Sequence, residues 1–332
     1  MKLGILGFAH SHVGMYIAEW RKTGAMELTA GWDHDVKRAA ESGLPVCQTI
    51  AELLGQVEAV VIAAETSRHA ELVEQAAAAG KAIILQKPLA LTLADADRIV
   101  AAVRNVPFTL AWQMRVDPHN VQLKSLLATG AFGKVCMLRR RHGLPTQTWP
   151  DFAKTWHVQP ELNRDVFADD AAHPLDFLYW LRGMPVSVSA ELGTLVNPAI
   201  VNDTGIAVLR FADGSLGEVS CSFVAVAGEN VTEVICERGV IIQNYGDVPS
   251  CNSPRPPGAG PQLKWFLDGK WHASELPEIK NHGERIAGLA APLAEFLHGK
   301  RPPIATAAEG RDVLRLVLAC YESDQQGKRI NL

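Results

Sequence analysis

The sequence predicts an α/β protein of two domains, in which a parallel, doubly wound sheet is followed by a large, open, mostly antiparallel sheet. A chain of 332 residues has room for about two domains of ordinary size. Between residues 2 and 112, short apolar runs alternate with longer segments of helical period, which is typical of βαβ units. After residue 134, strand-like segments follow one another with hairpin signals between them. We therefore predict domains at residues 1–116 and 117–332.

Five apolar runs in the first half have the continuous hydrophobicity of strands buried on both faces of a parallel sheet. They are residues 2–6, 27–32, 59–64, 82–85 and 108–111. Helical segments lie between them, the first at residues 13–21. Residues 67–79 carry apolar side chains at helical spacing, and Gly80 just beyond them is a natural C-cap. A further helix at residues 118–128 leads into the second half.

The second half contains segments with β character, and residues 139–141, three arginines, lie on another expected strand. The Ala-Asp-Gly-Ser sequence at residues 212–215 is a strong hairpin turn. A proline-rich surface loop is expected at residues 248–261, and helices at 284–297 and 307–323 close the chain. The predicted strands are residues 187–195, 204–211, 215–224, 231–237 and 240–244.

The composition excludes several classes of protein. Hydrophobic residues make up 48% of the chain and charged residues 20%, which is ordinary for a globular protein. A formal net charge of -4 gives no field that would hold a polyanion, so we expect no nucleic-acid partner. The apolar runs are shorter than the roughly 18 residues that a membrane span needs, so we expect no membrane partner. Six cysteines without a C-x-x-C pair, and a first strand in place of a signal peptide, predict a cytoplasmic protein with free thiols.

The turn after the first strand has the context of a dinucleotide-binding site. If Gly7 is the first glycine of a G-x-G-x-x-G fingerprint, Ala9 and His12 replace the second and third. Asp33 ends the second strand and is a suitable acceptor for the adenosine ribose hydroxyls, where it would repel a 2′-phosphate. The alternative for Asp33 is a solvated turn carboxylate.

His10 and His12 form an H-x-H pair at a strand end, a spacing that also occurs in metal sites. No third or fourth ligand can be named from the spacing. We therefore interpret both imidazoles as polar lining near a phosphate or nicotinamide, and we predict no metal site.

Two further groups carry potential chemistry. Lys87 ends the fourth strand, and Pro88 keeps it out of the helical region, so its ammonium is expected at the carboxyl edge of the sheet, unless it is a solvated charge. Asp169 and His173 share one face of an expected helix, with Asp176 one turn further along. A carboxylate that holds such an imidazole can prepare it for proton exchange with a substrate hydroxyl. The alternative is a helix N-cap beside a packed histidine.

These residues, in this order and spacing, resemble the glucose-fructose oxidoreductase, inositol dehydrogenase and MocA family, and the resemblance covers nearly the whole chain. Gln86 stands where the family usually has glutamate. The motifs that carry the resemblance are Gly7 with its helix, Asp33, Thr66 to His69, Gln86-Lys87-Pro88, Gln113-x-Arg115 and Asp169-x-x-x-His173-x-x-Asp176.

The resemblance implies a Rossmann domain, a nicotinamide cofactor, and oxidation or reduction of a sugar, inositol or related polyol. Asp33, which would repel a 2′-phosphate, favours NAD over NADP. The resemblance implies that His173 donates or accepts the proton, that Asp169 orients it, and that Lys87 polarises the reacting oxygen. It also implies a homodimer or homotetramer formed through the open sheet. The expected cofactor-binding residues are Gly7, Phe8, Ala9, His10, His12, Asp33, Thr66, His69, Gln86 and Lys87. The expected substrate-binding residues are Arg115, Trp156, His157, Asp170 and His173.

Two other functions stay open at this point. One is an enzyme of the same fold that keeps NAD bound and uses transient oxidation to cleave or epimerise a glycoside. The other is a non-catalytic, nucleotide-binding regulator, against which the retention of Lys87, Asp169 and His173 argues. Trp156 and His157 are the favoured wall of the substrate site, although a tryptophan can also be a core anchor. Of the arginines at 139–141, only one or two can face a cleft on an alternating strand. If they do, an acidic sugar is the substrate that they suit, but a solvated sheet edge is the favoured interpretation.

Overall fold

The computed structural model describes residues 1–227, 230–244, 258 and 260–332, and it divides into two compact units. Unit 1 comprises Met1–Gln113, Gln159–Asn163 and Ile286–Leu314. Unit 2 comprises Met114–Val158, Arg164–Arg285 and Arg315–Leu332. Each unit therefore contains segments that are distant in the sequence.

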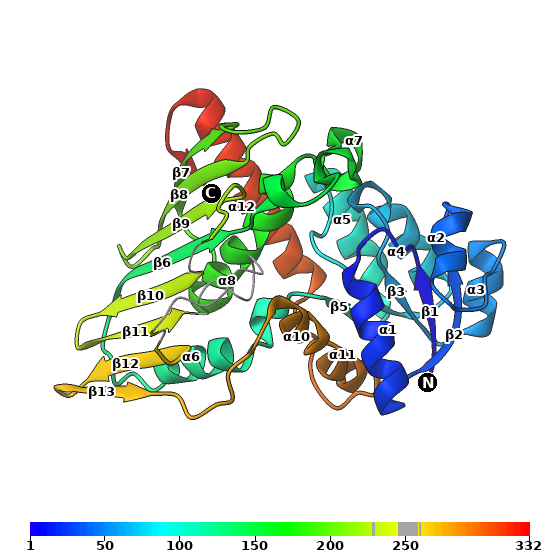
Figure 1. Ribbon diagram of the computed structural model, residues 1–332, viewed down its shortest axis with the longest axis horizontal. Coiled ribbons are helices and arrows are strands. Elements are labelled where there is room, and N and C mark those ends of the chain that lie inside the picture. The colour runs from blue at the N-terminus through cyan, green and yellow to red at the C-terminus, as the bar shows by residue number, and fades with distance from the viewer. Residues whose placement is uncertain (228–229, 245–257, 259) are drawn as a thin grey trace. The chain divides into compact units, whose positions relative to one another are not determined.

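Unit 1 is built on a five-stranded parallel sheet, as predicted (Figure 1). Its strand order is β2-β1-β3-β4-β5. The connection from β1 to β2 therefore runs toward one edge of the sheet, and the connection from β2 to β3 passes β1 toward the other edge. Right-handed crossovers in opposite directions place helices on opposite faces of a sheet, and β3 and β4 are accordingly buried at every residue. The strands are β1 (Lys2–Leu6), β2 (Glu27–Trp32), β3 (Ala59–Ile62), β4 (Ala82–Leu85) and β5 (Phe108–Leu110).

Several helices of unit 1 begin where the sequence supplies an N-cap. Thr49 Oγ1 accepts a hydrogen bond from Glu52 N, and Thr92 Oγ1 accepts one from Asp95 N, each at 3.1 Å. The helices of unit 1 and its 3₁₀ turns are α1 (His12–Thr23), α2 (Val36–Glu41), α3 (Ile50–Gln56), η1 (Thr66–Arg68), α4 (His69–Ala78), α5 (Leu93–Ala102), η2 (Val103–Asn105), α7 (Pro160–Asn163) and α11 (Ala290–Leu297).

The sheet of unit 2 has nine strands among the described residues, in the order β13-β12-β11-β10-β6-β9-β8-β7-β14. Its β6 and β9 run parallel and its other described pairs are antiparallel, which confirms a mixed, mostly antiparallel sheet. The strands are β6 (Val135–Gly143), β7 (Ser187–Gly193), β8 (Thr204–Arg210), β9 (Leu216–Ser222), β10 (Val231–Cys236), β11 (Gly239–Asn244), β12 (Leu263–Leu267), β13 (Lys270–Ala273) and β14 (Ile330–Asn331).

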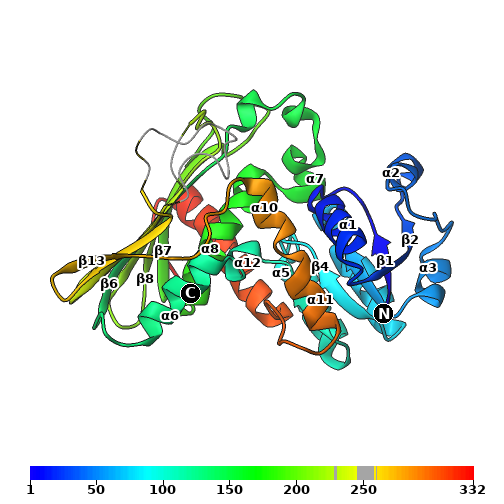
Figure 2. The same cartoon turned by 60° about the horizontal axis from the view of Figure 1, so that its bottom comes forward.

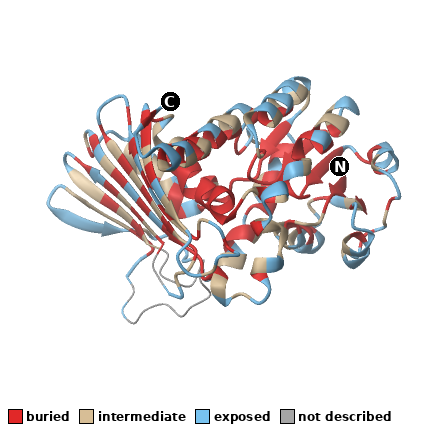
Figure 3. Cartoon of the chain, turned by 90° about the horizontal axis from the view of Figure 1, so that it is seen from above, coloured by how far each residue is buried: buried red, intermediate tan, exposed pale blue. Residues whose placement is uncertain are grey.

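One face of this sheet is covered and the other is open. Helices α6 and α8 lie against the covered face (Figure 2), and buried residues alternate with more exposed ones along the strands (Figure 3). The remaining helices and helical turns are η3 (Gln113–Arg115), α6 (Pro118–Ala128), η4 (Thr146–Thr148), η5 (Phe152–Lys154), η6 (Trp156–Val158), η7 (Phe167–Ala171), α8 (Ala172–Arg182), α10 (His282–Ala287) and α12 (Ala307–Gln326).

The structure differs from the predicted elements in a few places. The helix expected at residues 284–297 is two helices, α10 and α11. Pro292 has no N–H to bond the carbonyl of Gly288, which explains the break. The hairpin of β12 and β13 turns at Asp268 and Gly269, an Asp-Gly signal that the sequence analysis did not use.

The expected proline-rich loop and one of the six cysteines fall on residues that the structure does not describe. The loop at 248–261 lies largely outside the described residues, as does Cys251. The five described cysteines are free thiols. Among the described helices, none is both long and apolar enough to cross a bilayer.

Candidate functional site

The turn after β1 brings the backbone of three strands together. Gly7 has a φ of 86°, its N–H donates to the Trp32 carbonyl at 2.7 Å, and a Cβ at this position would meet the Ala64 Cα at 2.5 Å. His10 N donates to the Ala63 carbonyl at 2.9 Å. Only glycine fits at residue 7, because the conformation is left-handed and the backbone of the β3 edge is too close for a side chain.

The turn leads into the N-terminus of α1, where Ser11 occupies the N-cap position without a capping side-chain hydrogen bond. The first turn of α1 carries no acidic residue, so no carboxylate of that turn offsets the positive end of the helix dipole, which favours a phosphate there. The His10 and His12 rings pack edge to face at 4.3 Å between centroids. The predicted polar lining therefore lies at this helix terminus.

Asp33 lies beside the same turn and is 4% exposed. Its Oδ2 accepts a hydrogen bond from Phe8 N at 2.7 Å, and its Oδ1 accepts one from Asp35 N at 2.8 Å. Arg38 Nη2 also donates to Asp33 Oδ1, at 3.0 Å. Asp33 is thus a buried, ion-paired carboxylate rather than a solvated turn residue.

The loop after β3 carries Thr66 and His69. Thr66 Oγ1 donates to Asn163 Oδ1 at 2.6 Å. His69 Nδ1 lies 3.0 Å from the Pro88 carbonyl and Nε2 lies 3.3 Å from the Ala64 carbonyl. Burial lowers the pKa of His69 to about 4, so the imidazole is neutral at physiological pH and links the loops that follow β3 and β4.

Gln86 and Lys87 follow β4 and are both buried, Lys87 with 3% exposure. The Lys87 ammonium is therefore not the solvated charge that was the alternative from the sequence. Gln86 Nε2 donates to Tyr16 Oη at 2.9 Å, which attaches the end of β4 to α1. Burial raises the pKa of Tyr16 well above its ordinary value, so this phenol stays protonated.

In unit 2, the predicted helix around His173 is α8, and it is preceded by the π-helical turn η7. Asp169 and Asp170 lie in η7 and are buried, as is His173. His173 Nε2 lies 3.8 Å from Asp170 Oδ1, and His142 Nε2 lies 3.1 Å from Asp170 Oδ2. Asp170 therefore lies between two imidazoles, of which His142 on β6 was not predicted.

Asp165 lies two residues before η7 and anchors it. Its Oδ1 accepts hydrogen bonds from Ala168 N at 2.9 Å and from the Tyr321 hydroxyl, and its Oδ2 accepts one from Asn202 Nδ2 at 2.7 Å. Burial raises the pKa of Asp165 above its usual range, although these hydrogen bonds oppose the shift. Asp165 positions the segment that carries Asp169 and Asp170.

Asp176, one turn further along α8, binds Arg115 through two nitrogens. Arg115 Nη2 lies 2.7 Å from Asp176 Oδ1, and Nε lies 3.0 Å from Oδ2. Both side chains are buried. Two of the three guanidinium nitrogens of Arg115, a predicted substrate residue, are therefore engaged within unit 2.

The other predicted substrate residues form an aromatic stack on η6. The Trp156 and His157 ring centroids lie 4.1 Å apart at an interplanar angle of 28°, and the Phe152 ring stacks with His157 at 5.7 Å. Both Trp156 and His157 are half-buried. They present one continuous aromatic surface in unit 2.

The three consecutive arginines of β6 separate onto the two faces of the sheet. Arg140 is 2% exposed and donates to Thr232 Oγ1 at 3.0 Å and to Gln243 Oε1 at 3.2 Å. Arg139 is exposed and pairs with Glu218 and Glu233 on the neighbouring strands. Only the middle arginine lies on the face that also carries His142.

Two family models match this chain. Residues 1–111 match an oxidoreductase family with an NAD-binding Rossmann fold, and residues 120–242 match the GFO/IDH/MocA C-terminal domain. The chain belongs to the Gfo/Idh/MocA oxidoreductase family. The resemblance proposed from the motifs is therefore confirmed.

Several relatives of this Gfo/Idh/MocA protein are named dehydrogenases. It is 26% identical over 285 residues to a myo-inositol 2-dehydrogenase from Thermotoga maritima, which covers 83% of this chain and 80% of the relative. It is 31% identical over 236 residues to inositol 2-dehydrogenase 2 from Paenarthrobacter aurescens, with 65% and 67% covered. The solved WlbA dehydrogenase from Bordetella pertussis, in complex with NADH and UDP-GlcNAcA, shares the fold with a TM-score of 0.80 at 24% identity, covering 100% of this chain and 98% of that chain.

The residues of unit 1 fit the NAD that this Gfo/Idh/MocA family binds. Gly7 makes the tight, left-handed turn that the first glycine of the fingerprint provides, and Ala64 packs against it. The N-terminus of α1 offers the positive end of its dipole, and the buried Asp33 carboxylate directly follows β2. These are the three elements of a dinucleotide site, although Ala9 and His12 replace glycines of the fingerprint.

Proposed function

We propose that this protein is an NAD-dependent dehydrogenase or reductase that transfers a hydride between the nicotinamide and a hydroxyl or ketone of a sugar, inositol or related polyol. The observation that carries the proposal is the carboxylate of Asp170 between His142 and His173. Interconversion of an alcohol and a ketone moves a proton as well as a hydride, and a buried imidazole beside a carboxylate is suited to exchange that proton. The inositol 2-dehydrogenases among the relatives support the substrate class.

The proposed roles follow the family pattern. NAD, when bound, supplies the hydride acceptor or donor. His173 exchanges the proton with the substrate hydroxyl, Asp169 orients His173, and Lys87 supplies positive charge to the reacting oxygen. Asp170 completes the polar surroundings of His173.

The proposed binding residues divide between the two predicted domains. Residues 1–116 would hold NAD through the Gly7 turn, Asp33, and the loops that carry Thr66, His69 and Gln86. Residues 117–332 would hold the substrate. The half-buried aromatic stack of Trp156 and His157 suits the apolar C–H groups of a polyol ring, and the Asp170 carboxylate is an acceptor for its hydroxyls. Arg115, just before this domain, is the further proposed substrate residue.

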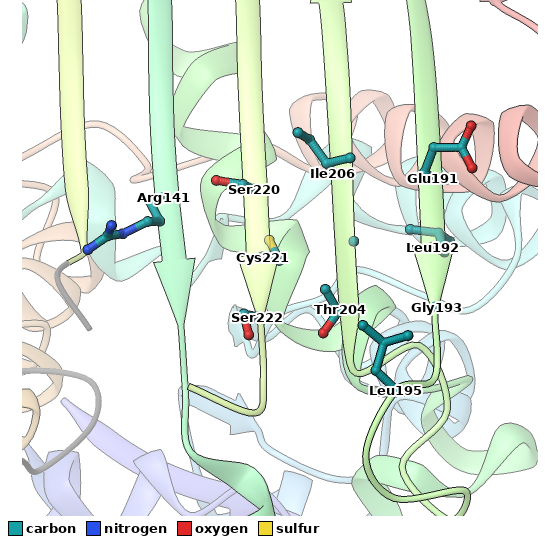
Figure 4. A pocket seen from close by; sticks show the side chains of 11 residues that line it. Arg141, Glu191, Leu192, Gly193, Leu195, Thr204, Ile206, Ser220, Cys221 and Ser222 are labelled. Atoms are coloured by element: carbon teal, nitrogen blue, oxygen red, sulfur yellow. The ribbon is translucent and has the colours of Figure 1, made fainter. Parts of the chain in front are cut away.

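We further propose that the protein forms a homodimer or homotetramer through the open face of the large sheet. Ile206 and Val208 of β8 are 41% and 45% exposed on this face. A depression of about 410 Å³ beside Ile206 is lined by Arg141, Glu191 and residues of β7, β8 and β9 (Figure 4). An apolar sheet face flanked by charges of both signs suits a self-complementary interface. Light scattering should give two or four times the monomer mass, and a monomer at micromolar concentration would contradict this proposal.

The test of the catalytic proposal is a panel of inositols, sugars and polyols with NAD, followed by the absorbance of NADH. We expect turnover with at least one member, a loss of about 10²-fold or more in kcat for His173→Ala, and a comparable loss for Lys87→Ala. Glu74→Gln, which removes one charge from an exposed ion pair with Arg98, is the matched control and should keep full activity. Product analysis distinguishes net oxidation from glycoside cleavage or epimerisation. If NAD binds and no member of the panel reacts, the substrate class is wrong.

A further inference from the structure

A cluster of five charged or titratable side chains lies beside the proposed adenosine site of unit 1, and its outermost member is the exposed Asp35, with Oδ2 3.8 Å from Arg38 Nε. Arg38 Nη2 lies 3.0 Å from Asp33 Oδ1 and 2.7 Å from Glu65 Oε1. His34 closes the cluster, with Nδ1 3.2 Å from Asp33 Oδ1 and Nε2 3.8 Å from Glu65 Oε1. One guanidinium nitrogen is thus shared between two carboxylates.

The strand order explains how these residues meet. Asp33 directly follows β2, and Glu65 follows β3 by three residues, immediately before η1. Because β2 and β3 both pair with β1, their carboxyl ends flank the Gly7 turn on either side. Arg38 reaches both carboxylates from α2, so the cluster spans the carboxyl edge of three strands.

Arg38 has the position and chemistry of a phosphate ligand. In Rossmann domains, an acidic residue at the end of the second strand accepts the ribose hydroxyls of NAD, and a nearby arginine can accommodate the 2′-phosphate of NADP. Arg38 is already bonded to Asp33, so its guanidinium lies next to the carboxylate that would bind the ribose. The Arg38 guanidinium can bind a 2′-phosphate only if neighbouring carboxylates do not already neutralise its positive charge.

Glu65 is the second carboxylate that neutralises the Arg38 guanidinium, after Asp33. The side chains of Asp33 and Glu65 are 0% and 5% exposed, whereas that of Arg38 is 25% exposed. Burial alone would lower the pKa of Arg38, but the hydrogen bonds and negative charges of Glu65 and Asp33 raise it above its ordinary value. Two buried carboxylates against one guanidinium leave a net negative charge when His34 is neutral.

We propose that Glu65 is a specificity-determining residue, which holds Arg38 in an ion pair and thereby denies it to the 2′-phosphate of NADP. The inference rests on the proposed preference for NAD and assigns it to two carboxylates rather than to Asp33 alone. A purely structural carboxylate would be satisfied within the fold. Glu65 Oε2 is instead buried without a hydrogen-bond partner among the described residues.

The test compares NAD and NADP binding by calorimetry in the wild type and in Glu65→Gln, on the full chain at about pH 8, above the ordinary titration range of histidine. Glutamine keeps an acceptor for Arg38 and removes the charge. We expect the affinity for NADP relative to NAD to rise by about tenfold or more, and the gain to shrink at high salt because Arg38 is partly exposed. Glu74→Gln, with the same charge change at an exposed pair elsewhere in unit 1, should leave the ratio unchanged.

A double variant assigns the gain to Arg38. Arg38→Gln combined with Glu65→Gln should lose the added affinity for NADP, and a double variant that keeps the full gain would overturn the role of Arg38. If Glu65→Gln weakens both nucleotides equally, or leaves their ratio unchanged, Glu65 only supports the loop and the inference fails while NAD use stands. If the wild type binds neither nucleotide, the proposed function fails together with the inference. Thermal melting of each variant verifies that it is folded.

Discussion

His142 Nε2 and Asp170 Oδ2 lie 3.1 Å apart, so a strand of the large sheet provides the imidazole that contacts a carboxylate at the head of α8. The same carboxylate lies 3.8 Å from His173. The orientation of the proposed proton-exchanging residue therefore depends on a strand that precedes it by about thirty residues in the sequence.

Replacement of Asp170 by asparagine tests this arrangement. The amide keeps the shape of the side chain but removes the negative charge between the two imidazoles. Without that charge the protonated imidazole is less favoured, so the pKa of the proton-exchanging imidazole, as read from the pH profile of kcat/KM, should fall. We expect kcat to fall by about 10²-fold while the affinity for NAD changes little. The pH–rate profile is the decisive measurement, because a merely structural residue would leave its midpoint in place. Asp213→Asn, at the exposed hairpin turn between β8 and β9, is the matched control in the same unit.

Asp176→Asn should destabilise the protein strongly. Removal of one member of a buried ion pair leaves the Arg115 guanidinium without its countercharge, which costs about 3–5 kcal/mol. Glu74→Gln breaks an exposed pair of similar length and should cost less than about 1 kcal/mol. Urea denaturation measures the free energy of unfolding of both variants. Equal losses of stability would contradict the expectation that the buried ion pair contributes more than the exposed one.

Gly7→Ala should abolish NAD binding and reduce stability by about 1–3 kcal/mol, because alanine is strained at a φ of 86° and its Cβ would meet the Ala64 backbone. Gly55 lies within α3, and a Cβ there meets nothing within 4 Å. Gly55→Ala should therefore stabilise the protein by about 0.5–1 kcal/mol. Calorimetric titration and denaturant unfolding test the pair, and normal NAD affinity in Gly7→Ala would refute the assignment of the turn.

Acidification should destabilise the fold through His69. Its pKa is about 4 in the folded protein, below the ordinary value of 6.5, so the unfolded chain binds more protons between these values. Stability contributed by the neutral imidazole is present at neutral pH and is lost as the pH falls below about 6.5, with about 2 kcal/mol lost between pH 7 and pH 5. His69→Asn should lose less stability than the wild type over this interval. Identical pH dependences of unfolding would contradict the buried, neutral state of His69.

Much of the fold follows from local patterns in the sequence. The strands β1, β2 and β4 agree residue for residue with the predicted runs. Only β4 is buried throughout, since β1 and β2 each begin with an exposed charged residue. The edge hairpin of β12 and β13 was missed because its strands carry exposed polar residues, as in Lys270–Ala273. The short strand β14 was missed because two residues give no periodic signal.

The candidate site could be predicted only where its residues share a motif. Lys87 and His173 are buried at the positions that the motifs indicated, and their catalytic roles stay predictions. The contact of His142 with Asp170 depends on the pairing of β6 within a sheet that no local pattern specifies. His142 lies two residues from Arg140 on one strand face, and this period of two was the available signal. The bond between Arg38 and Glu65 likewise depends on the strand order around β1.

The hydrogen bond from Trp20 Nε1 to the Ala290 carbonyl, 2.8 Å long, joins residues that are 270 positions apart. During synthesis, the five strands of unit 1 are available once residue 110 has emerged, but α11 follows only near the end of the chain. Until then, the nascent N-terminal part exposes the apolar surface of α1 that α11 will cover, and chaperones bind such surfaces. A fragment that stops at residue 116 would keep that surface exposed permanently, so it should aggregate where the full chain does not.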